Sequence, residues 1–284
     1  MEPTADVVRA LVAEQFPRWT DRSVTPVARQ GNDNRTFRLG ADLVVRLPAV
    51  SEYAAAVEKE DRWLPVIGRH VSLAVPEVVA TGGPGCGYPY PWSVRRWLPG
   101  DVPPAAGPVD DARVGADLGR FLHELHRAPA VGGPPAGAHS FGRGLHPSCY
   151  DDEVRVALAR PGPVVDRDAG EAVWAEALAT TWSGDPVWFH GDLAPGNVLV
   201  TGGRLSAVID FGTCGVGDPA CDLVIAWTWL GDAGRTAFRD AVDLDAGTWA
   251  RARGWALWKA LITEPGSPLR AEQQRALTLL LATA

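Results

Sequence analysis

The first hundred residues alternate short hydrophobic runs with polar turns, and two segments have a helical spacing instead. Residues 4 to 16 place their hydrophobic side chains on one side of an amphipathic helix. A second helix is predicted from Ser51 to Ile67. The runs with strand character are Val24–Arg29, Thr36–Leu39, Leu43–Leu47, Glu77–Thr81 and Tyr90–Trp97. This order predicts a five-stranded antiparallel sheet accompanied by one long helix.

The pattern becomes mainly helical from residue 109 onward. Asp110–Arg127 has the spacing of a long core helix, and further helices are predicted at Asp151–Arg160 and Asp166–Thr181. Val187–Phe189 forms a short buried strand. Two more apolar strands then flank the pair Gly202-Gly203, which suits a tight hairpin turn.

These patterns predict an α+β protein with two lobes. The first lobe, residues 1–98, carries the sheet. Residues 99–108 are rich in Pro, Gly and Ala, as expected of a linker. Residues 109–284 form the second, mostly helical lobe.

Composition narrows the classes of function. A net charge of -7 and a pI near 5.4 argue against nucleic acid as the main partner, and they are compatible with a cationic ligand. The four cysteines show no C-x-x-C spacing, there is no pattern of a signal peptide, and no run of about 18 apolar residues occurs. We therefore expect a cytoplasmic protein without a membrane span, and nothing implies a protein partner.

The residues with the clearest chemical signal lie in His190-Gly191-Asp192-Leu193-Ala194-Pro195-Gly196-Asn197 and, thirteen residues later, Asp210-Phe211-Gly212. An alcohol is a poor nucleophile at neutral pH, so a carboxylate must stand within reach of its proton, and Asp192 is the candidate. Mg²⁺ prefers oxygen ligands, which Asn197 and Asp210 would supply once the hairpin between them brings Asp210 back.

The form H-G-D-x-x-x-x-N followed by I-D-F-G resembles the aminoglycoside phosphotransferase family, the small-molecule branch of the kinase-like fold. The resemblance implies a two-lobed protein-kinase-like fold, Mg²⁺, and ATP or GTP as phosphoryl donor. It also implies transfer of the γ-phosphoryl to a hydroxyl of a small molecule, in the first place an aminoglycoside-type antibiotic. Macrolides, choline, homoserine and similar alcohols are alternative acceptors. A non-catalytic nucleotide-binding protein is a second alternative. A protein kinase is disfavoured, because Gly191 replaces an Arg and no A-P-E motif follows.

The resemblance also implies a nucleotide site in the first lobe. The loop Gln30–Arg35 takes the place of the kinase Gly-rich loop, and Asn32, Asp33 and Asn34 would present backbone N–H groups to the phosphates. An ordinary hairpin turn is the alternative. The main chain of the segment that follows the last strand would meet the adenine edge, through Arg96 and Leu98.

Arg46 stands where kinases place a strand lysine, and Glu60 follows fourteen residues later. Arg can grip phosphate oxygens with two N–H groups, so we expect it to clamp phosphates and to pair with Glu60. The alternative is a solvent-exposed Arg on an edge strand.

Two further residues are expected to support the loop: His190, as a brace, and Asp222, through backbone amides near the helix that starts at Asp218 and Pro219. In the resembled family the C-terminal helices line the acceptor site. The candidates here are Trp227, Asp232, Trp258 and Glu264. Such Trp residues more often pack a core, and such Asp residues often cap helices.

Overall fold

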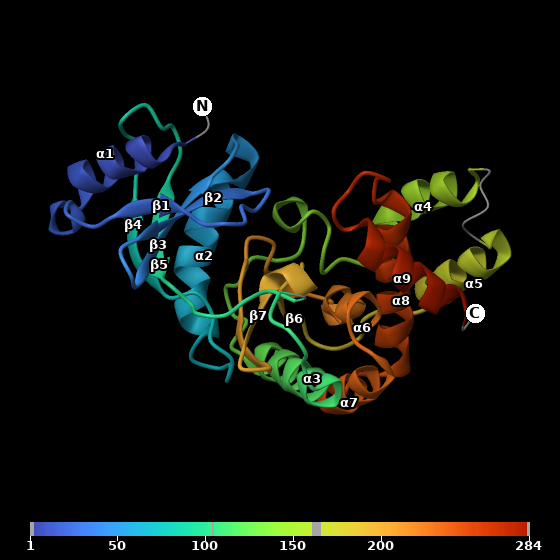
Figure 1. Cartoon of the computed structure of the whole chain (residues 1–284). Coiled ribbons are helices and arrows are strands. Elements are labelled where there is room, and N and C mark those ends of the chain that lie inside the picture. Colours follow the sequence, from blue (N-terminus) through green and yellow to red (C-terminus); the bar gives the residue numbers. More distant parts are fainter. Residues whose placement is uncertain (1–2, 104, 161–165, 283–284) are drawn as a thin grey trace.

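The computed structural model of the chain describes residues 3–103, 105–160 and 166–282. Pro104 of the predicted linker, and residues 1–2 and 283–284 at the ends of the predicted lobes, lie outside the described residues. A sheet-containing lobe and a mainly helical lobe lie side by side (Figure 1). The predicted α+β class with two lobes is therefore confirmed. The exact boundaries at residues 98 and 109 stay predictions.

The first lobe is built on an antiparallel sheet with, in the described part of the chain, five strands in the order β1-β2-β3-β5-β4. Every neighbouring pair is antiparallel, and β3 lies in the middle of the sheet. The strands are β1 (Val24–Pro26), β2 (Asn34–Leu39), β3 (Leu43–Pro48), β4 (Val78–Gly82) and β5 (Trp92–Arg96).

Two helices accompany this sheet. Helix α1 (Ala5–Gln15) buries Val8, Leu11 and Val12 in the core of the first lobe, together with apolar residues of β2, β3 and β5. Helix α2 (Ala54–Ile67) follows a 3₁₀ turn, and its last apolar residues pack into the core of the second lobe instead. Because α2 also contacts β4 and β5, it couples the sheet to the helical lobe.

The second lobe encloses a larger core to which most of its elements contribute. Its α-helices are α3 (Asp111–Arg127), α4 (Asp151–Leu158), α5 (Arg167–Leu178), α6 (Ile225–Thr228), α7 (Asp232–Val242), α8 (Ala246–Ile262) and α9 (Arg270–Leu281). Its strands form two short pairs, β6 (Val187–Phe189) with β9 (Gly215–Gly217), and β7 (Val198–Thr201) with β8 (Arg204–Val208). The 3₁₀ helices of the chain are η1 (Pro17–Trp19), η2 (Ser51–Tyr53), η3 (Ala138–Ser140), η4 (Pro147–Tyr150), η5 (Pro195–Asn197) and η6 (Pro219–Val224).

Several element boundaries differ from the sequence prediction. The first strand ends at Pro26 and not at Arg29, since proline cannot donate to the sheet ladder. The helix expected from Ser51 begins with the 3₁₀ turn η2. The helix expected after Asp218 starts as η6, and the Asp218 side chain caps it by accepting from Ala220 N at 3.0 Å. Among the described residues, none of the helices combines the length and apolar character that a membrane span requires.

Candidate active site

The motif from His190 to Asn197 lies between β6 and β7, at the side of the second lobe that faces the sheet (Figure 1). The turn between β7 and β8 uses Gly202 and Gly203, both with positive φ, so the hairpin closes tightly. The backbone N–H of Ile209 donates to the carbonyl of Asn197 at 2.9 Å. The hairpin thus returns Asp210 beside Asn197, as the sequence predicted.

Two side chains support this loop through hydrogen bonds to its backbone. Asp222, buried in η6, accepts from the backbone N–H groups of His190 and Gly191, each at 2.7 Å. The buried ring of His190 accepts from Asp192 N at 3.2 Å through Nδ1, and its Nε2 lies 3.0 Å from the carbonyl of Ile209. Both ring nitrogens are therefore engaged with the backbone, which is a bracing geometry for His190 as well as for Asp222.

Gly191 has a structural explanation. Its φ is +86°, in the left-handed region, and a Cβ there would lie 2.8 Å from the carbonyl oxygen of Thr213. A larger residue would strain the backbone and displace Thr213, whose hydroxyl donates to the His190 carbonyl at 3.1 Å. The loop in this form requires glycine at the position where protein kinases carry arginine.

Asp192 projects from the loop with its side chain 39% exposed. The Asn197 Nδ2 group donates to the Asp192 carbonyl at 2.8 Å and to its Oδ2 at 3.1 Å. Lys259 of α8 donates to the other carboxylate oxygen, Oδ1, at 2.7 Å. Burial by itself would raise the pKa of Asp192, but Lys259 and other nearby cations outweigh it and lower the pKa to about 2.

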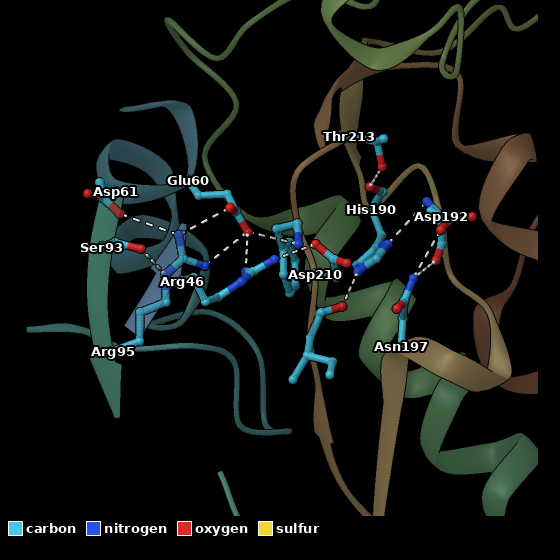
Figure 2. Close-up of polar contacts among 12 residues, drawn as sticks. Arg46, Glu60, Asp61, Ser93, Arg95, His190, Asp192, Asn197, Asp210 and Thr213 are labelled. Atoms are coloured by element: carbon cyan, nitrogen blue, oxygen red, sulfur yellow. Dashed lines mark hydrogen bonds and ion pairs between the residues drawn. The ribbon is translucent and has the colours of Figure 1, made fainter. Parts of the chain in front are cut away.

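A network of charges joins the two lobes at Asp210 (Figure 2). Arg46 of β3 donates to Glu60 of α2 at 3.2 Å and to Asp210 Oδ1 at 2.8 Å. The predicted contact between Arg46 and Glu60 is thus present. The alternative of an exposed edge-strand Arg is wrong, because β3 is central and the Arg46 side chain is only 13% exposed.

Arg95 of β5 completes this network, and the sequence did not reveal it. Its guanidinium donates to both carboxylate oxygens of Glu60 at 3.1 Å, and the backbone N–H of Phe211 donates to Glu60 at 3.1 Å. Asp210 itself has φ +67°, a conformation uncommon for residues other than glycine. Contacts from β3, α2 and β5 therefore hold the Asp-Phe-Gly segment in this conformation.

The predicted phosphate-covering loop reaches the same place. Burial and the carboxylates of Asp210 and Asp192 raise the pKa of Asp33 to about 6, while the Tyr53 hydroxyl hydrogen-bonds it and opposes this rise. Asn34 belongs to β2, and with Asp33 it lines a cavity of about 130 Å³ between the lobes. Asn32 is exposed. The carboxylates of Asp210 and Asp192 consequently act on Asp33 across the cleft.

These residues fit a hard cation. In the part of the chain that the structure describes, no group of three or more His, Cys, Asp or Glu side chains is arranged to hold a metal ion. Mg²⁺, however, keeps several waters and binds through one or two carboxylates plus substrate phosphates. Asn197 uses its Nδ2 atom toward Asp192, so its Oδ1 is directed elsewhere, and Asp210 uses Oδ1 toward Arg46. One carboxamide oxygen and a carboxylate oxygen suit Mg²⁺, and a cation would relieve the repulsion that raises the pKa of Asp33.

Comparison with known proteins agrees with this geometry. A family model described as the phosphotransferase enzyme family matches residues 23–255. The chain belongs to this family. No curated protein matches the sequence significantly.

Similar solved structures cover almost the whole chain of this phosphotransferase. The GDP complex of wild-type aminoglycoside 2'-phosphotransferase-IIIa has a TM-score of 0.72 at 19% identity, over 99% of each chain. The GDP and kanamycin complex of APH(2")-IIIa has a TM-score of 0.68 at 20% identity, over 97% of this chain and 96% of that one. Macrolide 2'-phosphotransferase MphH from Brachybacterium faecium has a TM-score of 0.63 at 21% identity, over 96% and 97%. At these identities the similarity establishes a shared fold.

In this phosphotransferase the backbone of Arg96, one of the two residues expected to meet the adenine edge, is partly engaged by the sheet. The backbone N–H of Arg96 donates to the Glu77 carbonyl at 2.9 Å, because Arg96 continues the sheet pairing of β5. The Arg96 N–H is therefore engaged in the sheet, and the predicted main-chain role of Arg96 toward an adenine edge stays a prediction. Leu98, which lies beyond the strand, stays a prediction.

The four predicted acceptor residues are scattered. Trp258 is only 4% exposed; it stacks on Tyr150 at 4.0 Å and donates to Glu153 at 3.0 Å. Trp227 packs against the helical core, Asp232 pairs with Arg235 at the start of α7, and Glu264 is exposed after α8. Among the described residues, no hydrogen bond or ion pair links any of the four to Asp192, so their role stays a prediction.

Lys259, like Arg95, is a site residue that sequence reasoning missed. It lies 67 positions from Asp192, and a periodic helix pattern says nothing about a partner at that separation. One signal was present: the chain holds only two lysines, Lys59 and Lys259, among 27 basic residues.

Proposed function

We propose that this member of the phosphotransferase family transfers the γ-phosphoryl of ATP or GTP to a hydroxyl of a small molecule. The observation that carries the proposal is the convergence of Asp192, Asn197 and Asp210 beneath Arg46, a cation that spans the two lobes. A carboxylate for the hydroxyl, oxygen ligands for a metal ion and a cation for phosphates are the parts that phosphoryl transfer needs.

In the proposed reaction the acceptor oxygen attacks the γ-phosphorus in line with the leaving oxygen. A bond forms between these two atoms, and the bond from phosphorus to the β–γ bridging oxygen breaks, which releases the nucleoside diphosphate. The Asp192 carboxylate orients the hydroxyl and takes its proton. Arg46 contacts phosphate oxygens from the β3 side, where Glu60 fixes its guanidinium.

Mg²⁺, when bound, would neutralise charge on the phosphates, and Asn197 and Asp210 would be its protein ligands. The phosphate-covering role of Asn32, Asp33 and Asn34 is part of the same proposal. The charges of Asp210 and Asp192 act on the Asp33 carboxylate, so the loop would approach the phosphates and the metal together.

The acceptor predicted by the resemblance is an aminoglycoside. Kanamycin is the first compound to test, because a solved relative with the same fold is described as its complex. A macrolide follows for the same reason, since another relative is a macrolide 2'-phosphotransferase. Small alcohols complete the panel.

The test measures nucleotide consumption with Mg-ATP and Mg-GTP across this panel, together with mass spectrometry of each acceptor. Asp192→Asn keeps the size of the side chain and removes its basicity, so transfer should fall about 10²–10⁴-fold while nucleotide binding persists. Asp240→Asn, an exposed carboxylate on α7, is the matched control and should behave as the unmodified protein. Undiminished transfer by Asp192→Asn would remove Asp192 from this role. Tight Mg-nucleotide binding without transfer to any acceptor would favour a non-catalytic nucleotide-binding protein.

A further inference from the structure

Lys259 occupies the place that an acceptor hydroxyl must reach. It lies in the last turn of α8 and donates to Asp192 Oδ1 at 2.7 Å, while Asn197 donates to Asp192 Oδ2 at 3.1 Å. Each oxygen of the carboxylate therefore already accepts a hydrogen bond from the protein. A carboxylate oxygen can accept two hydrogen bonds, so a hydroxyl that reaches Oδ1 either lies beside the Lys259 ammonium or replaces it.

The Lys259 side chain is suited to such a movement. Its backbone is held, because the Thr263 hydroxyl donates to the Lys259 carbonyl at 2.6 Å, but its ammonium sits on a flexible four-carbon stem. The side chain is 19% exposed, so it borders the open side of the site. In a chain that otherwise uses arginine almost throughout, a lysine at this position provides a charge that can change partners.

A second cation acts on Asp192. Arg143 lies over the Trp258 ring at 5.2 Å and donates to the Phe141 carbonyl at 3.3 Å. With Lys259 and His190 it lowers the pKa of Asp192 against the effect of burial. An acceptor that reaches Asp192 consequently approaches two positively charged side chains.

The charge of the acceptor follows from the position of this ammonium. Whether Lys259 stays beside the hydroxyl or turns away from Asp192, an anionic oxygen on the acceptor would pair with its ammonium. An ammonium group beside the hydroxyl would instead add a third positive charge. Resting on the proposed function, we propose that Lys259 selects the acceptor: it binds an anionic oxygen group next to the reacting hydroxyl and disfavours amino alcohols. This inference departs from the cationic acceptor that the sequence predicted.

Glu272 of α9 is the one competing partner to be tested. Burial raises the pKa of Glu272, whereas the charges of Lys259 and Arg29 oppose that rise and the Asp192 carboxylate adds to it. Gln273 donates to Glu272 Oε1 at 3.3 Å. If Lys259 turned to Glu272 on acceptor binding, the acceptor would need no anion, and Glu272→Gln would change the preference.

The experiment uses three probes with the same diol skeleton and different charge: glycerate, glycerol and aminopropanediol. Binding of each is measured by calorimetry in the presence of Mg²⁺ and a non-hydrolysable nucleotide, and turnover is measured with Mg-ATP and Mg-GTP. The unmodified protein should bind glycerate about 10- to 100-fold more tightly than aminopropanediol, the range expected for one hydrogen bond to a charged group. Lys259→Met should abolish this preference and leave nucleotide affinity unchanged. Lys259→Arg, which keeps the charge, should restore part of it, and Glu272→Gln should retain it.

Three results would overturn the inference. The first is equal affinity for the three probes, including no measurable binding of any, and the second is a preference that Lys259→Met leaves intact. The third is a preference that appears only in Glu272→Gln, since Lys259 would then pair with Glu272 and not with the acceptor. The proposed function fails separately. Selective glycerate binding without phosphoryl transfer to glycerate or to any compound of the wider panel would refute the reaction and uphold the charge selection.

Discussion

Replacement of Glu60 by glutamine tests whether the charges between the lobes stabilise the fold. The Glu60 carboxylate is 3% exposed and accepts from three directions: Arg46 at 3.2 Å, both Nη atoms of Arg95 at 3.1 Å, and the backbone N–H of Phe211 at 3.1 Å. Glutamine has nearly the same shape and can still accept from Phe211. The substitution therefore removes mainly the negative charge that two guanidinium groups share.

The expected loss in the free energy of unfolding is large, because the Arg95 guanidinium becomes a buried charge without a full counter-ion. The Arg95 side chain is 1% exposed, so water cannot replace the lost carboxylate. Removing one partner of a buried ion pair typically costs about 3–5 kcal/mol. For a chain of this size that corresponds to a fall in Tm of about 6–20 °C. Arg46 would keep Asp210 as its partner, but its orientation toward phosphates would be less restricted, and the KM for nucleotide should rise about 10-fold.

The pH dependence gives a second measure of the same effect. Burial would raise the pKa of Glu60, but Arg95 and Arg46 outweigh it and lower the pKa to about 2, below the ordinary 4.5. A carboxyl group with a depressed folded-state pKa contributes stability above pH 4.5, and that contribution is lost as the pH falls through about 2. The difference in the free energy of unfolding between the unmodified protein and Glu60→Gln should accordingly become smaller at acid pH.

Urea unfolding at neutral pH and at acid pH, with thermal unfolding alongside, measures the loss of stability and its dependence on pH. Glu58→Gln is the matched control, since Glu58 is exposed on the same helix and should change stability by less than about 0.5 kcal/mol. If Glu60→Gln unfolds within about 1 kcal/mol of the unmodified protein, the buried pair is not a net source of stability here and the reasoning fails.

Two further predictions concern the cleft and the helical core. Because the pKa of Asp33 is raised to about 6, chiefly by burial and by Asp210, the stability that protonated Asp33 contributes is present below pH 3.8 and is lost as the pH rises through about 6. In Asp33→Asn the free energy of unfolding should fall less over this pH range, by at most about 3 kcal/mol and by less where solvent screens the charges. Urea unfolding as a function of pH measures this difference, and an unchanged pH dependence would contradict the prediction. In Gly115→Ala the new Cβ would lie 2.1 Å from the Gly234 carbonyl oxygen, so α3 and α7 must move apart, at a cost of about 1–3 kcal/mol. Thermal unfolding against Gly266→Ala, where a Cβ meets nothing within 4 Å, measures this cost, and equal Tm values would contradict it.

The sequence by itself determined the features that depend on local spacing. Hydrophobic periodicity located the strands of the five-stranded sheet and the helices up to residue 181 to within a few residues, because the side-chain periods of strand and helix differ. The glycine pair between β7 and β8 made it possible to infer that Asp210 returns to Asn197. The motif spacing led directly to the family.

Apart from Arg46 and Glu60, whose contact the resemblance implied, only the tertiary structure decided which charged side chains of the site meet. Arg95 reaches Glu60 across 35 positions and Lys259 reaches Asp192 across 67, contacts that depend on how β5 and α8 pack. The same packing buries Trp258, which the sequence analysis had placed among the candidate acceptor-binding residues. A hydrophobic pattern states which face of an element is buried but not which residue lies opposite. The charge beside Asp192 was therefore decided by the packing of elements distant in sequence, and local spacing carries no record of that packing.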